Sequence, residues 1–120
     1  MLIAELAQET DSTPRALRYY EECGLLEPRR TSSGYRDYSD DDVARVRTIR
    51  RLLGAGFTSA EVAVLLPCMR GERIPEMCPQ VSATIGRALA TIDDDLDTLE
   101  QQRRTVRGLL EGERPATVEA

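Results

Sequence analysis

Arginine and tyrosine side chains gather in one short stretch of this 120-residue chain, residues 11–38. An arginine guanidinium can bind a phosphate or the edge of a guanine through paired N–H donors, and a tyrosine hydroxyl can add a further hydrogen bond. All 16 basic residues are arginine and none is histidine. Because the sequence also offers no nucleophile with a general base, it gives no sign of an enzyme. The pattern favours binding to nucleic acid.

The three cysteines are the other residues with chemistry of their own. We expect Cys23, at the end of a short helical pattern, to be a small, buried apolar residue. Cys68 and Cys78 flank a proline-containing linker, and three uses stay open for them. They can pack in a hinge, they can form a thiol redox pair, or they can ligate a soft metal ion such as Cu(I) or Hg(II) linearly. In the last case a carboxylate such as Glu72 or Glu76 can assist.

Two short helices must position the arginines. Residues 2–9 carry apolar side chains on one face, and after a tight turn residues 15–22 form a second helix. Thr13 can cap this second helix with its hydroxyl, and Pro14 suits the first helical position, where a missing N–H costs nothing. Gly24 is suited to the left-handed conformation that ends a helix.

The second helix has an apolar side and a polar side. Leu17 and Tyr20 share the face that can pack inward, whereas Arg15, Arg18 and Tyr19 fall on the opposite side. A short helix with outward arginines, entered by a tight turn from another short helix, has the shape of a DNA recognition helix.

A hairpin follows, with strands over residues 27–30 and 35–38 joined by a polar loop. Basic and aromatic residues make it suited to a wing that grips the phosphate backbone. These residues are Arg29, Arg30, Tyr35, Arg36 and Tyr38.

A longer helix begins after Ser39 and ends at Gly54, with apolar residues at three- and four-residue spacing. The acidic run that follows Ser39 favours a helix start, where the helix dipole attracts negative charge, over a metal site. Arg47 and Arg50 can reach DNA if this helix flanks the wing. A further helix ends at about Leu66, before a proline.

Residues 79–111 read as one long helix with a heptad repeat. A rod of roughly 45 Å with a single apolar stripe is not a stable monomer, so we expect a coiled-coil dimerisation arm. Arg103 interrupts the stripe and can pair with an acid such as Asp95 or extend outward. The predicted dimerisation residues are Ile85, Leu89, Ile92, Leu96, Leu99, Val106 and Leu110.

Three motifs in this order resemble the MerR family of bacterial transcription regulators. They are RYYE-x-x-GLL, then GYR-x-Y, then a helix that ends in a GF[ST]-x-x-E turn. The resemblance is dense over residues 1–66 and covers the long last helix by shape only. The family usually has glycine and an apolar residue where this chain has Asp11 and Ser12. We expect Ser12 to weaken local packing by about 1 kcal/mol.

The resemblance implies a homodimeric regulator on a palindromic promoter site. Similar proteins bind an over-long spacer between the −35 and −10 elements, and they distort this DNA so that RNA polymerase can use both elements. The long helices of two copies would pair antiparallel, and Cys78 matches one metal ligand of the family's metal sensors. The predicted DNA-binding residues are Thr13, Arg15, Arg18, Tyr19, Arg36, Tyr38, Arg47 and Arg50.

The sequence therefore predicts an all-α fold with a small β-hairpin wing. A winged helix-turn-helix domain (1–66) precedes a linker (67–78), an antiparallel coiled-coil dimerisation helix (79–111) and a flexible tail (112–120). The formal net charge of −5 opposes DNA binding overall, although much of the acid lies near the carboxyl end. No segment resembles a signal peptide or a membrane span, so we expect a cytoplasmic protein. The alternative is a dimeric protein-interaction module that does not bind specific DNA.

Overall fold

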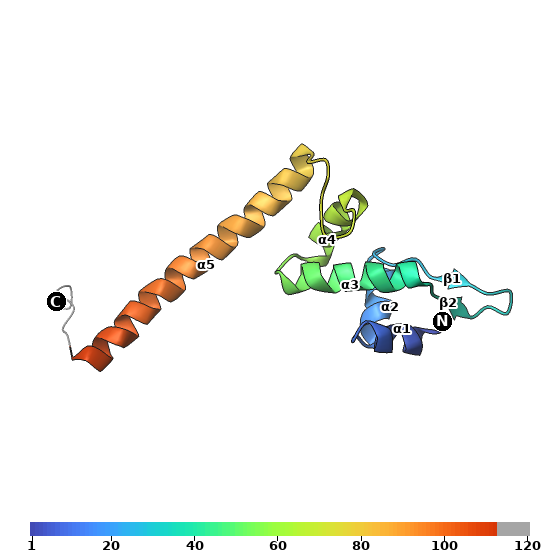
Figure 1. The fold of residues 1–120 in the computed structure, drawn as a ribbon, viewed down its shortest axis with the longest axis horizontal. Helices are drawn as coiled ribbons and strands as arrows, with labels where there is room; N and C mark the ends of the chain where they lie inside the picture. Colours follow the sequence, from blue (N-terminus) through green and yellow to red (C-terminus); the bar gives the residue numbers. More distant parts are fainter. Residues whose placement is uncertain (113–120) are drawn as a thin grey trace. The chain divides into compact units, whose positions relative to one another are not determined.

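The computed structural model describes residues 1–112, and over this range the chain forms helices and one small hairpin (Figure 1). The elements in order are α1 (Ile3–Glu9), α2 (Pro14–Glu22), β1 (Arg29–Arg30), β2 (Arg36–Asp37), α3 (Asp40–Gly54), α4 (Ser59–Leu65), the 3-10 helix η1 (Leu66–Cys68) and α5 (Pro79–Glu111). This order confirms the predicted fold class, a winged helix-turn-helix with a long carboxyl-terminal helix. The predicted tail lies outside the described residues from position 113 onward.

The caps of α2 form as the sequence predicts. The Thr13 hydroxyl accepts a hydrogen bond from the backbone N–H of Ala16 at 3.1 Å, and Pro14 occupies the first turn. Gly24 ends this segment with a φ of 75°, in the left-handed region that a glycine adopts without steric cost. The helix is therefore defined at both ends by local chemistry, independently of its partners.

The turn between α1 and α2 satisfies its polar side chains internally. The Thr10 side chain is buried and donates to the Leu6 carbonyl at 2.8 Å, while its oxygen lies 2.6 Å from the Ser12 hydroxyl. The backbone N–H of Ser12 also donates to the Ala7 carbonyl at 2.9 Å. Ser12 thus takes its usually apolar place with its hydroxyl paired, which offsets part of the weaker packing expected there.

Asp11 stores strain in this turn, because its φ is 54°. The left-handed region costs an L-residue roughly 1–2 kcal/mol, and less for Asp than for most residues. We therefore expect Asp11→Gly to raise the free energy of unfolding by about 0.5–1 kcal/mol, net of the larger entropy that glycine adds to the unfolded chain. Urea denaturation at a fixed protein concentration measures this, and Asp11→Ala should lower the same quantity. A glycine variant less stable than the parent would contradict the strain assignment.

One apolar core joins the first four helices and the hairpin. Leu6, Leu17, Val46, Ile49 and Val62 are fully buried in it, contributed by α1, α2, α3 and α4. Close packing of these side chains removes apolar area from water, which is the main favourable term in folding. The core therefore holds α2, the candidate recognition helix, by its inner face.

The starts of α3 and α4 show two forms of the same cap. At α4, Thr58 and Glu61 bond reciprocally, each backbone N–H donating to the other's side chain at 2.9 and 3.1 Å. At α3 the Ser39 backbone N–H donates to the Asp42 carboxylate at 2.9 Å. The Ser39 hydroxyl lies 3.4 Å from the same carboxylate.

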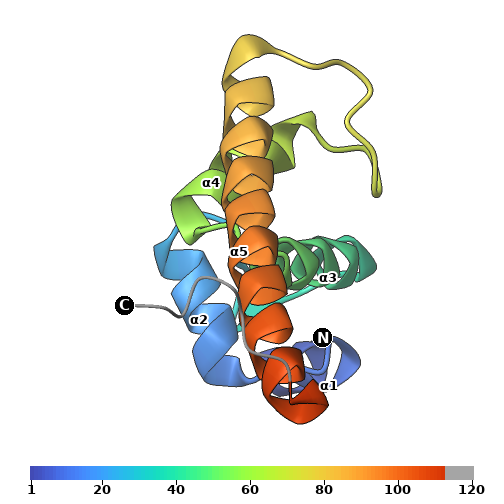
Figure 2. The same ribbon diagram turned by 90° about the vertical axis from the view of Figure 1, so that its left-hand side faces the viewer.

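The loop after η1 leads into α5, and Figure 2 shows it as a long tube between α4 and the first turn of α5. The chain divides into two compact units. The first covers Met1–Thr84, so it includes this loop and the beginning of α5. Val81 and Thr84 are 1% and 2% exposed, which explains why the unit extends into α5. From Ile85 onward the helix belongs to a second unit.

Candidate nucleic-acid interface

The outer face of α2 presents the predicted recognition residues to solvent. Arg15 and Arg18 are exposed, and Tyr19 is 50% exposed with its hydroxyl 3.5 Å from the Ser59 hydroxyl. Leu17 and Tyr20 are buried on the opposite face. The predicted division of the helix into two faces is correct, and contact of the outer face with DNA stays a prediction.

Thr13 has a structural task in this arrangement. Its side-chain oxygen accepts the cap bond from the Ala16 N–H, although the residue as a whole is exposed. A backbone N–H at a helix start and the hydroxyl proton of Thr13 are both donors, and both suit a phosphate oxygen. The cap and the predicted phosphate contact are therefore compatible.

The hairpin carries an exposed basic and aromatic tip. β1 and β2 pair antiparallel, with Arg29 opposite Asp37 and Arg30 opposite Arg36. Arg29 and Arg30 are exposed, and Tyr35 is 67% exposed at the loop. Such side chains can reach a phosphate backbone without distorting the fold, so the geometry suits a wing.

Tyr38 is a correction to the predicted interface. Its side chain is 3% exposed and belongs to the core, and its hydroxyl donates to the Glu21 carboxylate. Burial and then this carboxylate raise the pKa of the Tyr38 phenol above its usual value. The residue follows β2 at the point where the chain returns to the core, so its ring packs inward and is not free to contact a phosphate.

Arg36 occupies an intermediate position between the core and the surface. Its Nε lies 3.2 Å from the second Glu21 oxygen, and its side chain is 34% exposed. The contact is an ion pair without aligned hydrogen-bond geometry, since Nε has no hydrogen-bond partner. A predicted phosphate contact by Arg36 must therefore be made by the rest of its guanidinium.

Arg47 and Arg50 make structural contacts that the sequence did not predict, and contact of these exposed residues with DNA stays a prediction. Arg47 donates to the Glu9 carbonyl at 3.1 Å, and Arg50 donates to the Thr10 carbonyl. The last carbonyls of a helix lack partners within the helix and carry partial negative charge, so cations bind there. Both arginines are used to fix α3 against the end of α1, which the apolar spacing of α3 could not reveal.

Glu21 is the residue that the sequence interpretation missed. Its side chain is only 10% exposed, and it contacts both Tyr38 and Arg36 from the inner face of α2. A signal was present, because Glu21 follows Leu17 by four residues and Tyr20 by one, which places an acid beside an apolar face. A buried carboxylate requires a partner, and here the partners come from the hairpin.

Cys68 and Cys78 line one hollow of about 490 Å³ in the loop after η1, together with Arg70 and Glu76. Cys68 is half-buried and Cys78 is exposed.

Glu72, the other carboxylate expected to assist, instead pairs with Arg51 at 2.7 Å. Among residues 1–112, no group of three or more His, Cys, Asp or Glu side chains is arranged to hold a metal ion. The donor set suits two-coordinate sulfur ligation and does not suit a higher coordination number.

Cys23 behaves differently from the other two cysteines. It is partly buried and packs against the core cluster of α1 to α4. This position agrees with the expected role as a small apolar residue.

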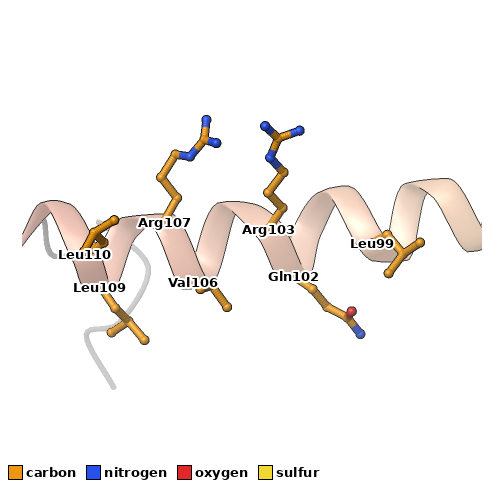
Figure 3. A pocket seen from close by; sticks show the side chains of 7 residues that line it. All are labelled: Leu99, Gln102, Arg103, Val106, Arg107, Leu109 and Leu110. Carbon is orange, nitrogen blue, oxygen red and sulfur yellow. The ribbon is translucent and has the colours of Figure 1, made fainter.

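The apolar stripe of α5 is exposed in the single chain. Leu96 is 58% exposed and Leu99 is 60% exposed, whereas Ile85 is half-buried. Figure 3 shows that Arg103 extends to the side of the helix opposite Val106 and Leu109. The exposed members are Leu89, Ile92, Leu96, Leu99, Val106, Leu109 and Leu110, of which Leu109 was not predicted.

Comparison with known proteins identifies the fold and the family together. Residues 1–67 match the family described as MerR HTH family regulatory protein. The HTH-type transcriptional regulator HmrR of Rhizobium leguminosarum bv. viciae is 32% identical over 111 residues, which cover 92% of this chain and 84% of that protein. Heavy metal-dependent transcription regulator 2 of Rhizobium meliloti is 30% identical over 110 residues, covering 91% and 74%.

Solved structures give the same result. The transcription regulator PbrR691 from Ralstonia metallidurans CH34, solved with lead(II), aligns at a TM-score of 0.67 and 27% identity, over 99% of this chain and 92% of that one. Within residues 1–112, no helix is both long and apolar enough to cross a bilayer. These relatives are transcription regulators and not enzymes. The chain belongs to the MerR family of helix-turn-helix regulatory proteins and is a DNA-binding transcription regulator.

Proposed function

We propose that this regulator works as a homodimer in which α5 pairs with α5 of a second copy. The exposed apolar stripe carries the proposal, because Leu96, Leu99 and Val106 are each more than half exposed. A helix with one apolar stripe on an otherwise polar surface gains stability by packing that stripe against a partner. A second copy offers the matching stripe at the same heptad spacing.

The charges of α5 favour an antiparallel pair. Acids gather at its middle, at Asp93–Asp95 and Asp97, whereas Arg103, Arg104 and Arg107 follow toward its carboxyl end. A parallel pair in register would place acid beside acid and arginine beside arginine. An antiparallel pair centred near residue 100 would place the aspartates of one helix beside the arginines of the other, and such charge pairing can fix helix orientation in coiled coils.

Two copies related by two-fold symmetry would present two α2 helices to a palindromic promoter site. Arg15, Arg18 and Tyr19 would enter the major groove, and Arg29 and Arg36 of the wing would hold the phosphate backbone. The family membership supports the further proposal that the dimer distorts the spacer DNA for RNA polymerase. We place this activity in the cytoplasm, where promoter DNA is accessible.

Fluorescence anisotropy with the reduced protein tests the proposal. The probe is DNA from upstream of the protein's own gene, titrated at two salt concentrations beside a scrambled duplex. Specific binding by two protomers per site, weakened as salt rises, is the expected result. Equal affinity for the scrambled duplex, with no effect of salt, would instead favour a dimeric protein-interaction module.

The signal that this regulator receives is a second question, and the hollow at Cys68 and Cys78 favours a soft metal ion. One relative is named as heavy metal-dependent, and another was solved with lead(II). In this chain the thiols and Glu76 line the same hollow, so a thiophilic ion could be held there without rearranging the core. A thiol redox signal at the same pair is the competing use, and it requires no third ligand.

Replacing Cys78 with serine should remove tight binding of Hg(II) by the reduced protein. Two-coordinate binding depends on both sulfurs, so the affinity should fall by more than about 100-fold, and Cys68→Ser should match it. Isothermal titration of the variants measures the affinity and the stoichiometry. Cys23→Ala is the control, since that thiol packs against the core and should leave one ion bound per chain. Equal binding by all variants would contradict the metal site and leave the redox pair.

A further inference from the structure

We propose that Glu21 is a positioning residue that holds the wing in register with the recognition helix for DNA binding. The inference rests on the DNA-binding function and assigns no contact between Glu21 and DNA. Glu21 lies on the inner face of α2, and its two oxygens meet two different residues at the end of the hairpin. One carboxylate therefore links the two elements that must contact the same duplex.

The contacts around Glu21 are complementary in charge and in hydrogen bonding. The Tyr38 hydroxyl donates to one oxygen, and Arg36 Nε lies 3.2 Å from the other. The side chain is 10% exposed, so it needs the cation and the donor to remain charged at low cost. A neutral side chain of the same shape cannot serve both neighbours, since it lacks the charge that pairs with Arg36.

Tyr38 is suited to be a permanent donor in this cluster. Burial and the Glu21 carboxylate raise the pKa of its phenol, so the hydroxyl keeps its proton throughout the physiological range. Its ring also belongs to the core, which fixes the point at which the hairpin leaves the body of the domain. The wing is thus anchored at its base while its tip remains exposed.

The rest of the hairpin has few ties to α2. Its strands are two residues each, and Arg30 donates to Gly34 at 3.1 Å within the same hairpin. The backbone of Met1 pairs with that of Tyr38 at 2.7 and 2.8 Å, but Met1 precedes α1 and does not lie on α2. A short isolated hairpin is marginally stable in water, so its orientation depends on its anchors. Glu21 is the residue of the recognition helix α2 that holds the base of the wing in place.

Glu22 provides a matched control, because it is the next residue of α2, carries the same charge and is exposed. Glu22→Gln removes one negative charge near DNA and leaves the wing untouched, so affinity should stay constant or rise slightly. Glu21→Gln removes the same charge and should weaken specific binding by about tenfold or more, because the wing no longer reaches its phosphates. The two substitutions therefore have opposite expected signs, measured by anisotropy on the same operator.

The salt dependence separates positioning from general destabilisation. A misplaced wing neutralises fewer phosphates, so the slope of log affinity against log salt should become shallower by about 0.9 for each phosphate that the wing releases. Partial unfolding lowers the active fraction and leaves this slope unchanged. Tyr38→Phe keeps the buried ring and the Glu21–Arg36 pair and removes only the hydroxyl, so the slope and the affinity should change in the same direction by smaller amounts.

Three outcomes decide the proposal. A shallower slope in Glu21→Gln and Tyr38→Phe, with Glu22→Gln like the parent, supports it. The proposal is overturned if Glu21→Gln and Tyr38→Phe leave the affinity and the slope unchanged. It is also overturned if the unfolded fraction measured in thermal melts accounts for the whole loss of affinity. If the parent and Glu22→Gln show no specific DNA binding, the proposed DNA-binding function is wrong. That result differs from one in which the parent binds specifically and Glu21→Gln binds equally well, which would refute only the role of Glu21.

Discussion

Leu96→Asp should dissociate the proposed dimer into monomers. Leu96 is 58% exposed in the single chain and lies in the middle of the apolar stripe of α5. Removing a buried leucine costs roughly 2–5 kcal/mol, and the symmetric dimer loses one in each copy. The dimer dissociation constant should therefore rise by more than about 1,000-fold, before the cost of burying a carboxylate is counted. Sedimentation velocity over a concentration series measures this directly.

Gln101→Asp is the control for that experiment. Gln101 is exposed and lies at the outermost heptad position, so it gains the same charge on the same helix outside the stripe. It should leave the dimer intact. If Leu96→Asp also left sedimentation unchanged, the heptad assignment would be wrong. Operator binding by Leu96→Asp should fall together with dimerisation, because a monomer holds only one half-site.

Arg18→Ala should abolish preference for the operator over other DNA. Arg18 is exposed on the outer face of α2, where a guanidinium can bind guanine through two parallel hydrogen bonds. Each such interaction contributes about 1–3 kcal/mol, and a dimer loses two of them. Anisotropy should show specific affinity falling toward the value for a scrambled duplex, while helix content and dimerisation stay constant.

Arg87→Ala removes the same charge from an exposed position on α5 and should bind the operator like the parent. A decrease in helix content in Arg18→Ala would show that this side chain is structural. A uniform decrease in affinity on all duplexes, without a change in preference, would assign Arg18 to phosphate instead of bases.

The helices and their ends could be predicted because their signals are local. Thr13, Pro14 and Gly24 define α2 by backbone chemistry within a few residues, and all three take their expected places. The apolar spacing of α3 and the heptads of α5 likewise depend on nearby residues alone. Family resemblance supplied the expected antiparallel pairing of α5, because the heptad pattern alone does not give a direction.

The contacts that the sequence did not predict join distant parts of the chain. Tyr38 meets Glu21 across 17 positions, and Arg47 meets the Glu9 carbonyl across 38. From the sequence alone, an arginine or a tyrosine that contacts DNA cannot be distinguished from one that contacts a carbonyl of the protein itself. Only the fold shows that a side chain such as Tyr38 is buried and therefore unavailable to a ligand.

The bond from Arg47 to the end of α1 has a consequence for how this regulator can change over generations. Arg47 meets the main-chain carbonyl of Glu9, and the exposed Glu9 side chain takes no part in the bond. Every amino acid supplies that carbonyl, so substitutions at position 9 keep the joint between α1 and α3 intact. The charge at position 9 can therefore change over generations while the bond that holds α3 against the end of α1 is kept.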